Sequence, residues 1–143
     1  MADSNKDVLR RIADEVVNPG NLAAADKYFS RDYVCHSPGG LEFHGPDGFR
    51  QMIGMYRQAF PDYHVVIEDM VEEGDRLAFR LTVRGTHNGD LAGIAPTGKS
   101  VTVSAIIIHR YSGGKCVEER QSVDEVGMFR RLGLTTLPTP AHA

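Results

Sequence analysis

Three ionisable side chains lie at predicted turns or strand ends, where they could reach a ligand. Asp124 follows the last predicted strand, where its carboxylate could transfer protons, cap a helix or form a surface salt bridge. His36 opens a predicted loop, where a neutral imidazole could donate to a carbonyl or simply be solvated. Arg110 is a permanent cation that could hold an anion or form an ion pair on the outer face of a sheet.

Other side chains could form the wall of a small-molecule pocket. Tyr33, Met52, Tyr56 and Phe60 are suited to a flat polycyclic ligand, but aromatic and apolar residues at helical spacing are also ordinary core residues. His87 ends a predicted strand, and its alternative role is to hold the following loop through a backbone hydrogen bond. Each of these residues therefore has a structural alternative as well as a functional one.

Charge and hydropathy argue against two classes of partner. The net charge is -3 and there is no dense stripe of Lys or Arg, so a nucleic-acid partner is not expected. The longest apolar run, residues 105–108, is far too short to span a bilayer, and the first residues contain no apolar signal region. We therefore expect a cytoplasmic protein that does not interact with membranes.

The sequence also contains no signal for a metal or an organic cofactor. The six His residues lack metal-site spacing, and the glycines of residues 93–98 lack the order of a phosphate-binding loop. Cys35 and Cys116 form no C-x-x-C motif and read as small packing residues. We predict no metal and no cofactor.

Hydrophobic periodicity predicts helices first and strands later. The expected helices cover residues 7–17, a short segment after Asn21, and residues 45–60; the expected strands cover residues 63–71, 76–87, 99–111 and 115–123. Tyr33 and His36 are expected where the second helix gives way to a loop. This order indicates an α+β fold in one domain over residues 1–143, with an extended tail from about residue 135.

Alternation within the strands sorts side chains by face. Leu77, Phe79, Leu81 and Val83 share one face of their strand, and Ala78, Arg80, Thr82 and Arg84 share the other. Glu118, Arg120 and Ser122 share a face of the last strand. Periodicity does not say which face points inward.

A series of short motifs resembles a known family. In order, these are residues 59–62 (AFPD), 73–75 (EGD), 85–87 (GTH), 95–99 (APTGK), 114–115 (GK) and 124–133. Together they resemble the SnoaL-like polyketide cyclase (ester cyclase-like) family of the nuclear transport factor 2-like and ketosteroid isomerase superfamily. The resemblance implies a cone-shaped α+β barrel, in which helices and a strongly curved, mainly antiparallel sheet enclose a pocket, and commonly a homodimer paired through the sheet.

The resemblance also implies an activity. Characterised members of this family close the last ring of anthracycline precursors by intramolecular aldol condensation, without metal or organic cofactor. It implies a cyclase that binds a small hydrophobic molecule carrying carbonyl groups. An epoxide hydrolase or hydratase on the same fold, or a non-catalytic binding and dimerisation module, is the alternative.

Individual residues take expected roles from the resemblance. Asp124 matches the catalytic acid/base position, and Arg110 matches a position where known cyclases tend to carry His. His109 is adjacent but cannot replace that His, because neighbouring strand residues point to opposite faces.

Three further charged residues match family positions. Arg80 and Glu118 match positions that are usually charged, and they could form a buried pair lining the cavity if their strands are adjacent. Arg120 stands where ester cyclase-like relatives commonly carry Trp and anthracycline cyclases also carry Arg. This detail favours the cyclase interpretation.

Overall fold

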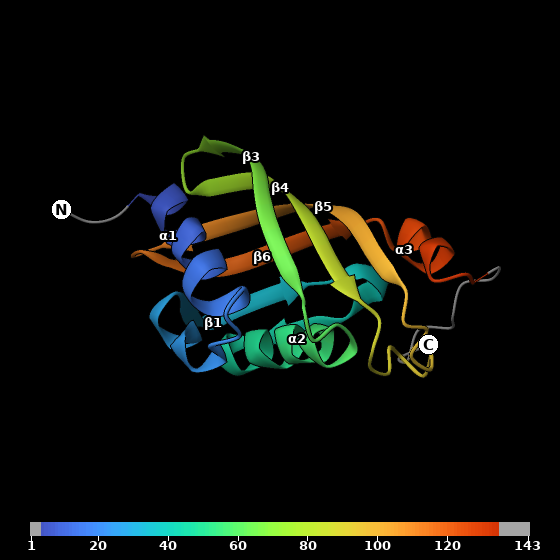
Figure 1. Ribbon diagram of the computed structural model, residues 1–143. Helices are drawn as coiled ribbons and strands as arrows, with labels where there is room; N and C mark the ends of the chain where they lie inside the picture. Colours follow the sequence, from blue (N-terminus) through green and yellow to red (C-terminus); the bar gives the residue numbers. More distant parts are fainter. Residues whose placement is uncertain (1–3, 135–143) are drawn as a thin grey trace.

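The computed structural model describes residues 4–134, so the tail expected from about residue 135 lies outside the described residues. The elements are α1 (Asn5–Arg11), the π-helix η1 (Ile12–Val17), the 3-10 helix η2 (Leu22–Lys27), β1 (Phe29–His36), the 3-10 turn η3 (Pro38–Gly40), β2 (Glu42–His44), α2 (Gly45–Ala59), β3 (His64–Glu73), β4 (Arg76–Thr86), β5 (Ser100–Ser112), β6 (Lys115–Val123) and α3 (Glu125–Arg131). Figure 1 shows their arrangement. The α+β class expected from the sequence is confirmed.

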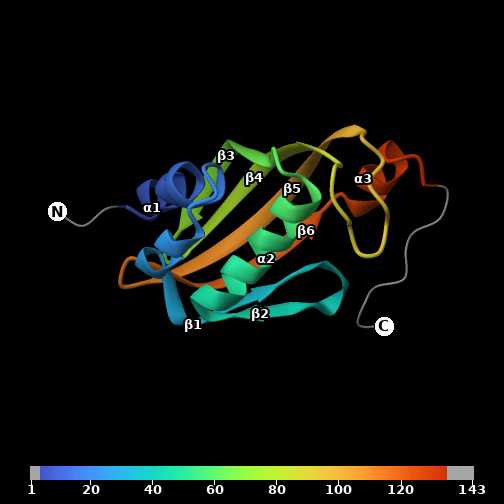
Figure 2. The ribbon, with the colours of Figure 1, turned by 60° about the horizontal axis from the view of Figure 1, so that its bottom comes forward.

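The six strands form one curved sheet in the order β2-β1-β6-β5-β4-β3. Neighbouring strands are antiparallel except β1 and β6, which are parallel. The register shifts in three of the pairs, including β5 with β6 between Arg110 and Tyr111, and such irregularities bend a sheet. Figure 2 shows α2 and the N-terminal helices on one side of this bent sheet.

The inner face of the sheet follows from strict alternation along β4 and β5. The inward residues are buried and the residues between them are largely exposed. Leu77, Phe79 and Leu81 are buried in the core, which confirms that the apolar face of this strand is the inner one. On α2, Phe49, Met52 and Ile53 form the buried stripe that faces the sheet.

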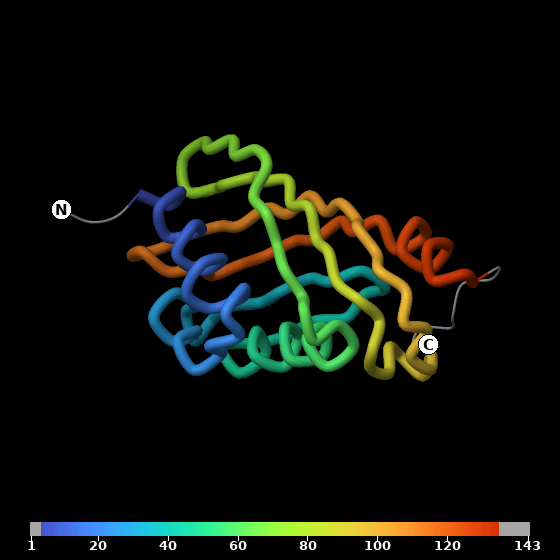
Figure 3. Tube along the Cα trace, in the orientation of Figure 1, coloured from blue at the N-terminus to red at the C-terminus, as the bar shows by residue number. Residues whose placement is uncertain are grey.

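The segment between β4 and β5 is tied to the end of α2. Figure 3 shows it beside the carboxyl end of that helix. The backbone N–H groups of Asn88 and Gly89 both donate to the Ala59 carbonyl, at 3.1 and 3.0 Å. A Cβ atom on Gly89 would lie 1.9 Å from the Gln58 carbonyl oxygen, so only glycine permits this approach. The loop is therefore held against the helix.

The sequence prediction misplaced one region. Tyr33 and His36 lie within strand β1 and not at the junction of a helix and a loop. Strand β1 forms because β2 and β6 both pair with it, and the β6 residues are more than 80 positions away. A distant pairing partner of this kind leaves no local signal in the sequence. Among residues 4–134, no helix is long and apolar enough to cross a membrane.

Candidate functional site

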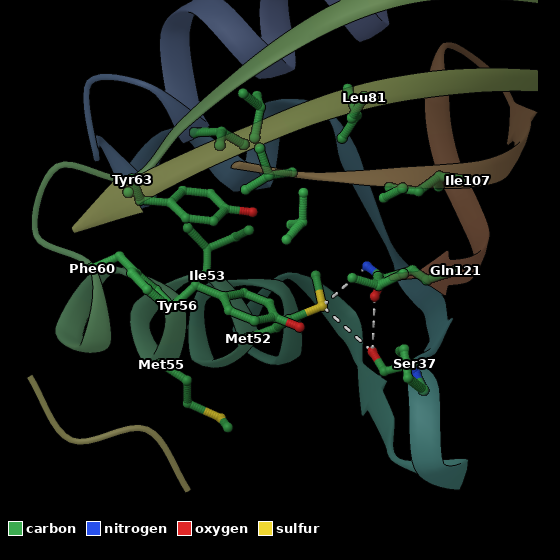
Figure 4. A pocket seen from close by; sticks show the side chains of 18 of the residues that line it. Ser37, Met52, Ile53, Met55, Tyr56, Phe60, Tyr63, Leu81, Ile107 and Gln121 are labelled. Carbon is green, nitrogen blue, oxygen red and sulfur yellow. Dashed lines mark hydrogen bonds between the residues drawn. The ribbon is translucent and has the colours of Figure 1, made fainter. Parts of the chain in front are cut away.

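A cavity of about 440 Å³ lies between α2 and the inner face of the sheet. Its wall is mainly apolar, with Met52, Ile53 and Tyr56 from α2 facing Leu81, Ala105 and Ile107 from the sheet. Figure 4 shows these elements converging on the space. Volumes of this order accommodate small organic ligands, and an apolar wall favours a hydrophobic one.

One end of the cavity is polar. The Gln121 side-chain amide donates to the Met52 sulfur at 3.4 Å, and the Ser37 hydroxyl donates to the Gln121 carbonyl oxygen at 3.4 Å. Figure 4 marks these contacts with dashed lines, together with a third from the Ser37 hydroxyl to the Met52 sulfur at 3.6 Å. All three bonds are long, so a ligand carbonyl or hydroxyl could compete for either group.

A buried network supports Gln121 from behind. His109 and Glu119 are each only 3% exposed. One Glu119 oxygen accepts from His109 Nε2 at 2.8 Å and from the Tyr33 hydroxyl at 2.9 Å, and the other accepts from Gln121. His109 Nδ1 contacts the Tyr111 hydroxyl at 2.8 Å. This network fixes the Gln121 amide at the cavity end.

The charge balance of this network keeps Glu119 ionised. Burial alone would raise the pKa of Glu119, but the charge of His109 and the hydrogen bonds from His109, Gln121 and Tyr33 overcome burial and lower the pKa below 4.5. A carboxylate that is already bonded at both oxygens is a weak proton acceptor. Glu119 is therefore suited to positioning Gln121 and not to removing protons from a ligand.

Two tyrosines point into the cavity from its other side. The rings of Tyr56 and Tyr63 stack with centroids 5.6 Å apart, and Figure 4 shows both projecting into the space. Burial raises the pKa of Tyr56 to about 12, with a smaller contribution from the nearby charge of Glu125. Burial raises the pKa of Tyr63 as well. Both phenols therefore stay protonated at neutral pH and could donate a hydrogen bond to a ligand oxygen.

Two further carboxylates line the cavity, Asp90 on the loop after β4 and Glu125 at the start of α3. Asp90 accepts from the Gly93 backbone N–H at 3.1 Å and shapes its loop. Burial raises the pKa of Glu125 above 4.5. Asp90 is therefore engaged by its own loop, whereas the Glu125 side chain forms no hydrogen bond within residues 4–134.

The structure brings together five of the predicted site residues. Met52, Tyr56, Phe60 and His109 line the cavity. Tyr33 is fully buried behind the polar end, where its hydroxyl donates to Glu119. Three of the four expected wall residues therefore line the cavity, whereas Tyr33 lies behind its polar end and His109 also belongs to the supporting network.

Asp124 lies outside the cavity, which corrects its expected position. Its carboxylate caps α3 by accepting from the Gly127 N–H at 2.9 Å, and it lies 3.8 Å from the Arg131 guanidinium. Its side chain is 47% exposed. A capping side chain must fold back over its own helix, and this turns the carboxylate away from the cavity.

Removing this cap should cost stability. An Asp124→Ala variant is expected to lose about 1 kcal/mol of unfolding free energy, the usual cost of a lost N-cap. Asp124→Asn should restore most of it, because Asn is also a good N-cap. Urea unfolding of the three proteins measures this, and equal stability of the Ala and Asp proteins would show that the cap contributes nothing.

Four other predicted residues lie on the outer face of the sheet or its rim. His36 lies between Glu42 and Glu118, at 3.1 and 3.5 Å. Glu118 also lies near Arg110 and Arg120, at 3.8 and 3.4 Å. None of these side chains lines the cavity. The inward positions of β5 and β6 here belong to His109 and Glu119, so their neighbours must point outward.

Arg80 does not form the expected pair with Glu118. Its guanidinium bonds to Asp69 at 2.8 Å on the exposed face. Strand β5 separates β4 from β6, so the two side chains are not on adjacent strands. The expectation of a buried pair lining the cavity is wrong.

His87 supports the loop and not the cavity wall. It is fully buried, and its Nδ1 accepts from the Thr97 N–H at 3.3 Å and contacts the Thr97 hydroxyl at 3.0 Å. Phe60 packs beside it, with ring centroids 5.6 Å apart. His87 therefore holds the loop that follows β4, which is the structural alternative considered for it.

Sequence reasoning missed Glu119, Gln121 and Glu125. The first two alternate with Glu118 and Arg120 on β6, and the correct inward set follows only once the inner face of the strand is known. Glu125 directly follows Asp124, the residue that the sequence indicated as the catalytic acid/base. Within residues 4–134 no group of three His, Cys, Asp or Glu side chains is placed to hold a metal ion.

Comparison with known proteins agrees with this architecture. The SnoaL-like polyketide cyclase profile matches residues 7–132. The chain is 32% identical to the nogalonic acid methyl ester cyclase of Streptomyces nogalater over 81% of this chain and 88% of the relative. It is 30% identical to the aklanonic acid methyl ester cyclase AcmA of Streptomyces galilaeus over 83% and 84%.

A solved structure shares the fold. IdmH of Streptomyces antibioticus, a proposed polyketide cyclase, superposes with a TM-score of 0.81 at 27% identity, covering 92% of this chain and 100% of IdmH. The profile match spans nearly the whole chain, and the matched residues build both the sheet and the cavity. The chain belongs to the SnoaL-like polyketide cyclase family.

Proposed function

We propose that this protein is a cyclase that closes a ring in a hydrophobic, carbonyl-bearing small molecule by intramolecular aldol condensation, without a metal or organic cofactor. The observation that carries the proposal is the apolar cavity of about 440 Å³ with polar groups gathered at defined points of its wall. Family membership supports the cyclase assignment.

The reaction needs a proton acceptor and hydrogen-bond donors. A base must remove the acidic proton beside a carbonyl, and donors must stabilise the enolate and the alkoxide that follow. Gln121, Ser37 and the two tyrosines supply donors around the cavity. The apolar wall would hold the ring system and keep water away from the enolate.

The names of the relatives guide the choice of substrate. Two are cyclases of nogalonic and aklanonic acid methyl esters, so methyl esters of this class are the first to test. Purified protein in chelator-treated buffer would be incubated with each ester and the products separated by liquid chromatography and mass spectrometry. A new protein-dependent isomer of unchanged mass supports the proposal. A product heavier by one water would favour the hydratase alternative, and no conversion of either ester would argue for the binding module.

We also propose a homodimer paired through the outer face of the sheet. Ile106 and Ile108 are 57% and 43% exposed on the outer face of β5, which favours a partner surface there. Ile106→Lys is expected to shift the protein from dimer to monomer in light scattering coupled to size exclusion, with Ala23→Lys at an exposed position of η2, away from the outer face of the sheet, as control. A wild-type monomer at high concentration would rule the dimer out.

The cytoplasm remains our proposed location. Cys35 and Cys116 are free buried thiols, as is usual for proteins of reducing compartments. Localisation of a tagged protein by fractionation tests it.

A further inference from the structure

We propose that Glu125, on the first turn of α3, is the general base of the ring closure, with the Tyr56 hydroxyl as the hydrogen-bond donor opposite it. This inference rests on the proposed function and names the catalytic groups of the same cavity. It replaces Asp124, the residue that the sequence had indicated for this role.

Comparison of the cavity carboxylates leads to Glu125. Within residues 4–134 the cavity is lined by three carboxylates, Asp90, Glu119 and Glu125. Asp90 is used to close its loop on the Gly93 N–H. Glu119 is fully buried, and its two oxygens are occupied by His109, Tyr33 and Gln121. Among the described residues, Glu125 forms no hydrogen bond or ion pair, so its oxygens are free to accept a proton from a ligand.

The position of Glu125 follows from how the chain leaves the sheet. Strand β6 ends at Val123, Asp124 folds back to cap α3, and the next residue then turns toward the cavity. The half-buried Glu125 side chain lines this mainly apolar cavity, and among residues 4–134 it forms no ion pair. Burial raises its pKa above 4.5, which brings it toward the range of an effective base.

Tyr56 lies close enough to Glu125 for the charge of this carboxylate to affect the pKa of the phenol. The nearby charge of Glu125 adds to burial in raising the pKa of Tyr56 to about 12. Figure 4 shows the Tyr56 hydroxyl projecting into the cavity. It forms no hydrogen bond with another side chain or backbone group of residues 4–134. An acceptor and a donor therefore face the same space from α3 and α2.

The proton and electron movements balance with these two groups. Glu125 takes the proton from a carbon flanked by two carbonyls, and the C–H electrons become an enolate. The enolate carbon attacks a ketone carbon of the same molecule, forming a C–C bond while the ketone π electrons move to oxygen. The resulting alkoxide, held by Tyr56, takes the proton back from Glu125. The product is an isomer of the substrate, and the carboxylate is regenerated.

The test compares Glu125→Gln with Asp124→Asn, a matched pair of neighbours that each lose one charge. Glu125→Gln is expected to lower kcat by about 10²- to 10⁴-fold with a binding constant near wild type, whereas Asp124→Asn stays within about threefold. Glu125→Asp keeps a carboxylate one methylene shorter and should give an intermediate rate. Circular dichroism checks that each variant is folded.

A second readout separates proton removal from ring closure. Methyl benzoylacetate has an acidic carbon but no ketone placed for cyclisation, so its deuterium uptake in D₂O above the protein-free rate reports the base alone. Uptake that Glu125→Gln abolishes, in a protein that closes no ring, would support Glu125 and overturn the cyclase proposal. Ring closure at the wild-type rate by Glu125→Gln would overturn Glu125 and leave the cyclase standing. Loss of both activities in Asp124→Asn alone, or a wild type with neither activity, would overturn the inference.

Discussion

An Ala105→Phe variant is expected to fold and yet bind aklanonic acid methyl ester at least about 10-fold more weakly than wild type. Ala105 is 4% exposed on the inner face of β5 and lines the cavity. A phenyl ring at this position would occupy space that the ligand needs, and a steric penalty of about 1.4 kcal/mol or more corresponds to a loss of about 10-fold or more in affinity. Equilibrium titration, with unfolding followed in parallel, measures both quantities.

Ser104→Phe is the matched control for this experiment. Ser104 is the preceding residue of the same strand and points to the outer face. Its substitution adds the same ring without filling the cavity, so ligand affinity should be unchanged. If Ala105→Phe binds as tightly as wild type while Ser104→Phe does not, the ligand does not occupy this cavity.

A Glu119→Ala variant is expected to lose about 3–5 kcal/mol of unfolding free energy. The substitution removes the acceptor for His109, Tyr33 and Gln121 in a fully buried place, and breaking a buried ion pair by removing one partner has costs of this size. Urea unfolding at pH 7 measures the loss. Glu118→Ala, on the neighbouring half-exposed position, should change stability by less than about 1 kcal/mol.

The pH dependence gives an independent check on Glu119. Because the folded protein holds the pKa of Glu119 below 4.5, its ionised form contributes stability above 4.5, and that stability is lost as the pH falls. The difference in unfolding free energy between wild type and Glu119→Gln should therefore shrink as the pH decreases below 4.5. A difference that grows toward acid would mean that Glu119 is protonated in the native protein at neutral pH.

Much of the fold could be predicted from local pattern. The strands β3 to β6 and the helix α2 have strong periodicity and clear turn residues, and the structure places them within a few residues of the expected bounds. Strands β1 and β2 were not predicted, because they are stabilised by pairing with distant residues of β6 and with each other.

The site was harder to predict because a shift of one position along a strand moves a side chain to the opposite face of the sheet. The sequence indicated Arg110, Glu118, Arg120 and Asp124 as site residues. In the structure the cavity is lined instead by the residues next to them, His109, Glu119, Gln121 and Glu125. The alternation along β6 was visible in the sequence, but nothing in it said which half points inward. The apolar wall was easier, since Met52, Tyr56 and Phe60 lie on a helix whose buried stripe is read directly from spacing.

The most direct test of the account is a crystal structure of the protein with methyl benzoylacetate bound. We expect the ligand in the cavity between α2 and the sheet, with its acidic carbon about 3–3.5 Å from a Glu125 oxygen, near-attack geometry for proton transfer. A ligand bound on the outer face beside His36 and Arg110, or at the exposed Asp124 carboxylate with the cavity unoccupied, would contradict it.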